Sequence, residues 1–131
     1  MVLKLKKKKL AVLGLAVGLL AIGGTAQAGT SYSSYNTTVG KFNGNGYTGY
    51  QTKSSSGTYG DLRSNTVGGN YVVDARMQAS SGTGSWVRNV TDNDTRSLPN
   101  SVARGSSARV QFSNDLTTPV NVQVTGSWRS N

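Results

Sequence analysis

A two-residue alternation in the segment Asn70–Ser80 constrains the fold of this chain more than any other feature. One side of an extended strand there carries only Tyr71, Val73, Ala75, Met77 and Ala79. Most of the residues between them are polar. A helix would need its apolar residues at a spacing of about 3.6, which this segment lacks. The alternation therefore predicts a strand in the middle of a sheet.

A second alternating run near the end of the chain indicates another central strand. Its apolar side carries Val120, Val122, Val124 and Trp128. Shorter strand-like segments lie between, and turn residues recur about every 8–12 residues, the spacing of an all-β domain. No helical run follows Ala28. We therefore predict a small antiparallel β-sandwich, or a partly open barrel, of about seven to eight strands.

The turn signals predict hairpins and the strand faces predict a core. We expect hairpins at Asn43–Gly46, at Gly68-Gly69 and at Asp92–Asp94, because Asn, Asp and Gly favour tight turns between antiparallel strands. The predicted core consists of Val39, Phe42, Leu62, Tyr71, Val73, Ala75, Met77, Trp86, Val110, Phe112, Val120, Val122, Val124 and Trp128.

The first 28 residues have the three-part pattern of a secretory signal peptide. Five lysines in Met1–Lys9 precede an apolar run, Leu10–Ile22, and then the small residues Ala26 and Ala28. An apolar run of this length reaches only about 20 Å as a helix, less than the roughly 30 Å of a bilayer core. We predict cleavage after Ala28, no stable membrane anchor, and secretion by a bacterium, with a Gram-positive source suggested by the lysines.

The mature chain would be one all-β domain, residues 29–131, in which residues 29–36 are candidates for disorder. The whole chain has a formal net charge of +9, but five of its 14 Lys and Arg residues lie in the leader, which leaves +4. The remaining basic residues are scattered, so the sequence predicts no nucleic-acid partner. The chain has no cysteine, so disulfides cannot stabilise this small domain.

Several kinds of chemistry are excluded by composition. The chain has no His, Cys or Glu, which rules out a Ser-His-Asp or Cys-His triad and a zinc site built on Cys or His. The five aspartates lie mostly in predicted turns, where Asp commonly accepts backbone N–H groups. We read Asp92–Asp94 as such a turn rather than as a calcium site. The sequence thus predicts a protein without enzymatic activity, catalytic residues, metal or other cofactor.

The candidate binding residues are tyrosines and lysines in the Gly-, Ser- and Asn-rich part of the chain. Tyrosine offers rigid amphipathic area, and its small polar neighbours offer adaptable hydrogen bonds. Tyr47 and Tyr50 fall on opposite faces of a predicted strand, so at least one of them should be exposed. The candidates are Tyr47, Tyr50, Tyr59, Lys41 and Lys53.

Three functions are compatible with these features. The first is an exported binding or interaction protein outside the cell or at the bacterial cell envelope, whose partner is a cell-wall polymer or another envelope protein. The second is a secreted antimicrobial or toxin protein, because in size, export and composition the chain resembles cysteine-free, β-rich bacteriocins, among them one lactococcin type. The third is an extracellular structural subunit that self-associates through sheet edges.

Overall fold

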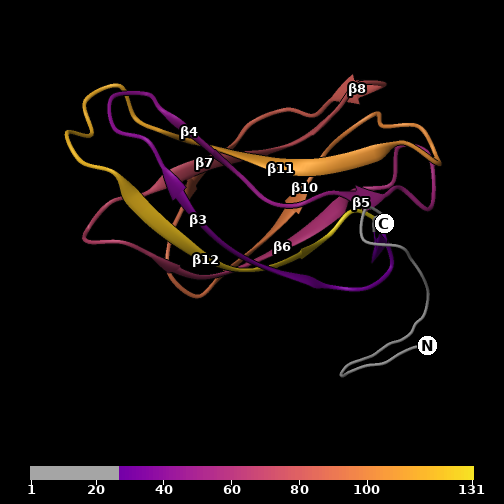
Figure 1. The fold of residues 1–131 in the computed structure, drawn as a ribbon, viewed down its shortest axis with the longest axis horizontal. Coiled ribbons are helices and arrows are strands. Elements are labelled where there is room, and N and C mark those ends of the chain that lie inside the picture. Colours follow the sequence, from indigo (N-terminus) through magenta and orange to yellow (C-terminus); the bar gives the residue numbers. More distant parts are fainter. Residues whose placement is uncertain (1–26) are drawn as a thin grey trace, which may run out of the picture.

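The computed structural model describes residues 27–131, which form two packed β-sheets (Figure 1). In Figure 1 one layer holds β11, β7 and β4, and the other holds β12, β6 and β3. The predicted all-β fold is confirmed, and the sheets are not closed into a barrel. Among the described residues no helix is long and apolar enough to cross a membrane. The predicted leader, residues 1–28, lies outside this part of the chain except for Gln27–Ala28, which form the short strand β2.

The four-stranded sheet has the order β10-β6-β12-β3, with every pair antiparallel. Its strands are β3 (Ser33–Val39), β6 (Gly60–Val67), β10 (Asp94–Leu98) and β12 (Val122–Arg129). The last strand in the sequence is therefore flanked on both sides. Residues 29–36, the candidates for disorder, contain the first half of β3.

The seven-stranded sheet is built around β11 and β7, which pair antiparallel along seven residues. β2 and β5 continue the sheet on one side, β8 on the other, while β4 also pairs with β11 and β9 with β7. Within residues 27–131, β2 and β5 are the one parallel pair of this sheet. The strands are β2 (Gln27–Ala28), β4 (Asn45–Tyr47), β5 (Gln51–Thr52), β7 (Val73–Ala79), β8 (Gly82–Thr83), β9 (Val87–Val90) and β11 (Ser107–Asn114).

The core lies between the inner faces of the two sheets, where both alternating runs place their apolar side chains. The structure confirms ten of the predicted core residues: Val39, Leu62, Val73, Ala75, Met77, Val110, Phe112, Val122, Val124 and Trp128. The prediction missed further buried apolar residues: Tyr35, Val67, Val90, Leu98, Val102 and Ala108.

Four core predictions were wrong in part or in full. Phe42 is exposed because it lies in a turn with a positive φ of 53°. Val120 is exposed because it precedes β12, where the chain passes from one sheet to the other. Tyr71 and Trp86 are half-buried at the margins. The predicted core was therefore too large, because the alternation of apolar residues continues past the ends of the strands.

The three predicted hairpins were also wrong, although each predicted turn exists. The turn at Asn43–Gly46 joins β3 to β4, Gly68-Gly69 joins β6 to β7, and Asp92–Asp94 joins β9 to β10. In every case the two strands belong to different sheets. Asp92 accepts a hydrogen bond from the Val67 backbone N–H at 2.7 Å, so it is a backbone acceptor for the end of β6 rather than for its own turn.

A tyrosine and a glycine on adjacent strands are closely packed in the four-stranded sheet. Tyr35 of β3 faces Gly126 of β12, which in turn faces Ser64 of β6. The Tyr35 ring crosses Gly126 and packs against Phe112 of the other sheet, with ring centroids 5.0 Å apart. The hydroxyls of Tyr35 and Ser64 are buried, and neither meets hydrogen-bond geometry. Burial raises the pKa of Tyr35 to about 12, an effect that Ser64 opposes in part.

We expect the protein to lose stability in alkali because of Tyr35. The phenol of the unfolded chain ionises near pH 10.0, whereas the folded one keeps its proton to about pH 12. Across this interval the unfolded state binds fewer protons, so the free energy of unfolding falls as pH rises, by about 3 kcal/mol in total. Urea unfolding at pH 8 and pH 11 should show the loss in the wild type and a smaller one in Tyr35→Phe. An equal loss in both proteins would contradict the prediction.

Candidate functional site

The outer face of the seven-stranded sheet carries a continuous row of arginine, glutamine and aromatic side chains. β11 and β7 direct their apolar residues inward, so the alternate positions of both strands point outward. β4, the segment after it and the segment before β9 add the aromatic rings. We call this surface the Arg–aromatic face, and define it by Tyr47, Tyr50, Arg76, Gln78, Trp86, Arg109 and Gln111.

Glutamines hold both arginines of this face in place. Arg109 lies opposite Gln78 in the pairing of β11 with β7, and its Nε donates to the Gln78 Oε1 at 2.9 Å. Arg76 lies opposite Gln111, and its Nε donates to the Gln111 Oε1 at 2.8 Å. The Gln111 amide also donates to Asn45 Oδ1 at 3.0 Å. Each arginine therefore uses one N–H within the sheet, and its orientation is fixed by a cross-strand contact.

Two tyrosines flank the guanidinium of Arg109. The Arg109 Cζ lies 3.9 Å from the centre of the Tyr47 ring and 5.2 Å from that of Tyr50. Both rings are exposed, at 37% and 50%. The expectation that they lie on opposite faces was wrong, because β4 ends at Tyr47 and the chain is irregular up to β5. The arrangement is a cation–π cluster of one guanidinium and two rings.

Trp86 forms a second cation–π cluster further along the face. The Arg76 Cζ lies 4.3 Å from the centre of the indole ring, and the Arg88 Cζ lies 6.0 Å from it. Arg88 also forms an ion pair with the buried Asp74, 2.6 Å from Nη1 to Oδ2. The negative charge of Asp74 is thus matched by Arg88, which leaves Arg76 as an uncompensated cation.

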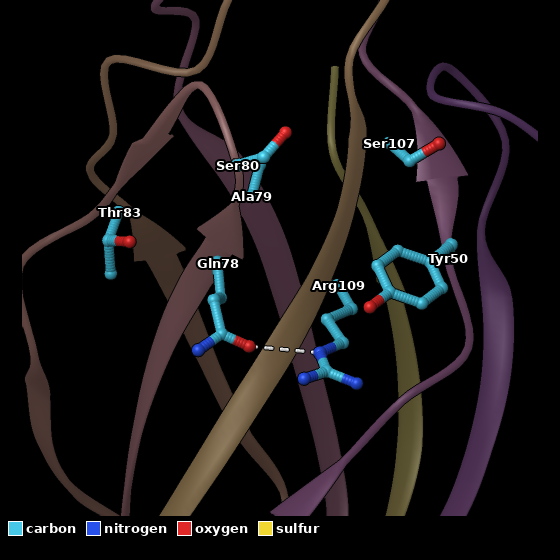
Figure 2. A pocket seen from close by; sticks show the side chains of 7 residues that line it. All are labelled: Tyr50, Gln78, Ala79, Ser80, Thr83, Ser107 and Arg109. Carbon is cyan, nitrogen blue, oxygen red and sulfur yellow. Dashed lines mark hydrogen bonds between the residues drawn. The ribbon is translucent and has the colours of Figure 1, made fainter.

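A groove opens beside Arg109, between β11 and the β7–β8 turn (Figure 2). Figure 2 shows the Tyr50 ring on one side of Arg109 and the Gln78 amide hydrogen-bonded on the other. The groove has a volume of about 520 Å³, and each of its lining residues except Ala79 carries a polar side-chain group. The lining residues are Tyr50, Gln78, Ala79, Ser80, Thr83, Ser107 and Arg109.

The other two exposed candidates lie away from this face. Tyr59 lines a smaller groove of about 270 Å³ together with Pro99 and Asn100, and the two grooves share only Thr83. Lys41 lies in the turn after β3, with its Nζ 6.0 Å from the Phe42 ring centre. The structure therefore brings together Tyr47 and Tyr50, but not Tyr59 or Lys41.

Lys53 requires a correction, because it is 1% exposed and cannot contact a ligand. Its Nζ donates to the backbone carbonyl of Ser130 at 2.7 Å and to that of Thr58. Burial lowers the pKa of Lys53, since the charged amine has lost water. The neighbouring Gln51 is buried as well and hydrogen-bonds the backbone of Trp128 and Ser130. Through these hydrogen bonds the two side chains hold the backbone at the end of β12 against β5.

Sequence reasoning missed the arginines, the glutamines and Trp86 of the face. The alternation placed Arg76, Gln78, Arg109 and Gln111 on the polar sides of their strands, and this was the available signal. What joins them is the pairing of β7 with β11, two strands about thirty residues apart in sequence. Nothing local specifies that pairing, so the row of side chains could not be assembled from the sequence.

The arrangement presents spare hydrogen-bond donors and rings rather than a reactive group. Within residues 27–131 no three acidic side chains gather closely enough to hold a metal ion. The chain matches no protein-family model, no curated protein and no solved structure.

Proposed function

We propose that this protein is an exported, non-enzymatic binding protein that acts outside the cell or at the bacterial cell envelope through its Arg–aromatic face. Arg109 carries the proposal, because it is held between two exposed tyrosine rings by a fixed glutamine contact. Guanidinium groups with adjacent aromatic rings are typical of binding surfaces, where they lose little conformational entropy when a ligand arrives. The leader pattern of residues 1–28 supports the location.

Retention on purified Gram-positive cell walls tests the proposal. We expect the wild-type protein to sediment with walls at physiological salt, and Tyr47→Ala/Tyr50→Ala to bind about tenfold more weakly, a loss of about 1.4 kcal/mol. The reason is that the double substitution removes both rings beside Arg109. The fraction bound is measured by quantitative immunoblotting over a range of wall concentrations.

Tyr59→Ala is the matched control, because Tyr59 is an exposed tyrosine that lies outside the Arg–aromatic face. It should bind walls as the wild type does. If the wild type is not retained, or if Tyr59→Ala weakens retention as much as the double variant does, the proposal is wrong. Circular dichroism of all three proteins checks that the substitutions leave the sheets intact.

A further inference from the structure

We infer that the ligand of the Arg–aromatic face is a polyanionic carbohydrate polymer, and that Arg76 and Arg109 bind two of its acidic groups at once. The inference rests on the proposed function and specifies the ligand. Both arginines have N–H donors that no described residue uses. An arginine has five N–H donors, and the Nε–H of each of these two donates to a glutamine. Their Nη groups have no acceptor among the described residues and form open forks suited to a carboxylate or phosphate.

The charge around these forks favours an anion. Asp74 is paired with Arg88, Asp94 with Arg96 and Asp61 with Arg129, so these acids are already neutralised. Neither Arg76 nor Arg109 has an ion-pair partner within the described part of the chain. Two positive charges therefore stand on one face without compensation, and they attract an acidic ligand.

The spacing of the two forks indicates a ligand with repeated acidic groups. Arg109 lies opposite Gln78, and Arg76 is two residues from Gln78 on the same face of β7. The two arginines are therefore diagonal neighbours, with backbones about 7–8 Å apart. The Arg109 guanidinium lies against Tyr47 of β4 and the Arg76 guanidinium against Trp86 before β9, on opposite sides of the β11–β7 pair, so two acidic groups of one linear polymer can bind one fork each.

The surroundings of Arg109 match a carbohydrate better than a peptide. The groove beside it is lined by the hydroxyls of Ser80, Thr83 and Ser107, and the one aliphatic side chain in its lining is Ala79. Such a lining can hydrogen-bond sugar hydroxyls but offers no pocket for an apolar side chain. The exposed Tyr50 ring provides a flat apolar surface on which a sugar ring can stack.

Calorimetric titration with three probe polymers tests the inference. The probes are polygalacturonate, which carries carboxylates, phosphomannan, which carries phosphates, and neutral dextran. We expect binding to at least one acidic polymer, weakening as NaCl rises from low to physiological concentration, and no binding to dextran. Comparing the two acidic polymers identifies the acidic group. Equal affinity for dextran, or no affinity for either acidic polymer, would overturn the inference.

The variants Arg76→Gln and Arg109→Gln show whether each of these arginines binds the polymer. Each keeps much of the side chain but loses the charge and the fork, so each should weaken binding about tenfold, and the double variant about 100-fold. Arg104→Gln is the control, because Arg104 is exposed, has no ion-pair partner among residues 27–131 and lies outside the face. A double variant that binds like the wild type would overturn the inference, as would an equal loss in Arg104→Gln.

Walls with and without their acidic polymers separate this inference from the proposed function. We expect retention on intact walls and little on walls from which the acidic polymers have been extracted. Equal retention on both would overturn the inference and leave the proposed binding function in place. Retention on neither would overturn the proposed function.

Discussion

Replacing Val122 with Asp should leave the protein unfolded at room temperature. Val122 is 1% exposed and begins β12, with its side chain between the two sheets. An aspartate there would bury a carboxylate without a partner, which costs more than about 4 kcal/mol. Domains of this size are stable by about 5–15 kcal/mol, and this one has no disulfide to support it. Near-ultraviolet circular dichroism and thermal melting measure the outcome.

Val120→Asp is the matched control for this substitution. Val120 lies two residues earlier and belongs to the same side of the alternating sequence, yet it is 43% exposed. A carboxylate at that position stays in water, so the melting temperature should change by no more than a few degrees. If both variants melt like the wild type, the packing assigned to β12 is wrong. If both unfold, the boundary between strand and loop is wrong.

Replacing Gly126 with Ala should destabilise the fold by about 2–4 kcal/mol. A Cβ atom at Gly126 would lie 2.2 Å from the backbone carbonyl oxygen of Arg63 and 2.6 Å from the Tyr35 hydroxyl. The carbonyl belongs to the adjacent strand β6 and cannot move without breaking the sheet. The Tyr35 ring would have to leave its contact with Phe112. Urea denaturation gives the loss directly from the shift of the midpoint.

Gly49→Ala separates this steric effect from the general consequence of replacing glycine. A Cβ atom at Gly49 would meet no heavy atom within 4 Å, so this variant should be close to wild type in stability. In the Tyr35→Ala background the cost of Gly126→Ala should be smaller, because the hydroxyl is gone, but the part of the cost caused by Arg63 should remain. Equal midpoints for the Gly49 and Gly126 variants would show that β12 and β6 are further apart than the structure has them.

The strands were predictable from the sequence, whereas their partners were not. Alternation in Val73–Ala79 and Val122–Arg129 is a local signal. It depends only on which face of its own strand each residue occupies, and the apolar face is the buried one. A turn signal such as Gly68-Gly69 shows that the chain changes direction. It does not show whether the next strand joins the same sheet or the other one, because glycine allows either connection. The predicted hairpins were wrong for this reason.

The candidate site was likewise predictable only where neighbouring residues determine exposure, and not where a residue far away in the sequence does. Exposed tyrosines were a sound expectation from composition, and Tyr47 and Tyr50 lie on the Arg–aromatic face. Lys53 was misplaced because its acceptor, the Ser130 carbonyl, lies 77 residues away. A lysine with no visible acceptor in the sequence is expected to be solvated, and only the tertiary structure shows that it is buried.

The place of β12 between β6 and β3 bears on when this protein is able to fold. Since β12 follows β3, β6 and β10 in the sequence, the four-stranded sheet has a gap between β6 and β3 until residue 129 is present. A chain that emerges from a membrane channel amino-terminus first would therefore remain incompletely structured during most of its passage. For the proposed export such a delay would be favourable, because a translocation channel accepts extended polypeptide and β12 would then complete the sheet on the outer side.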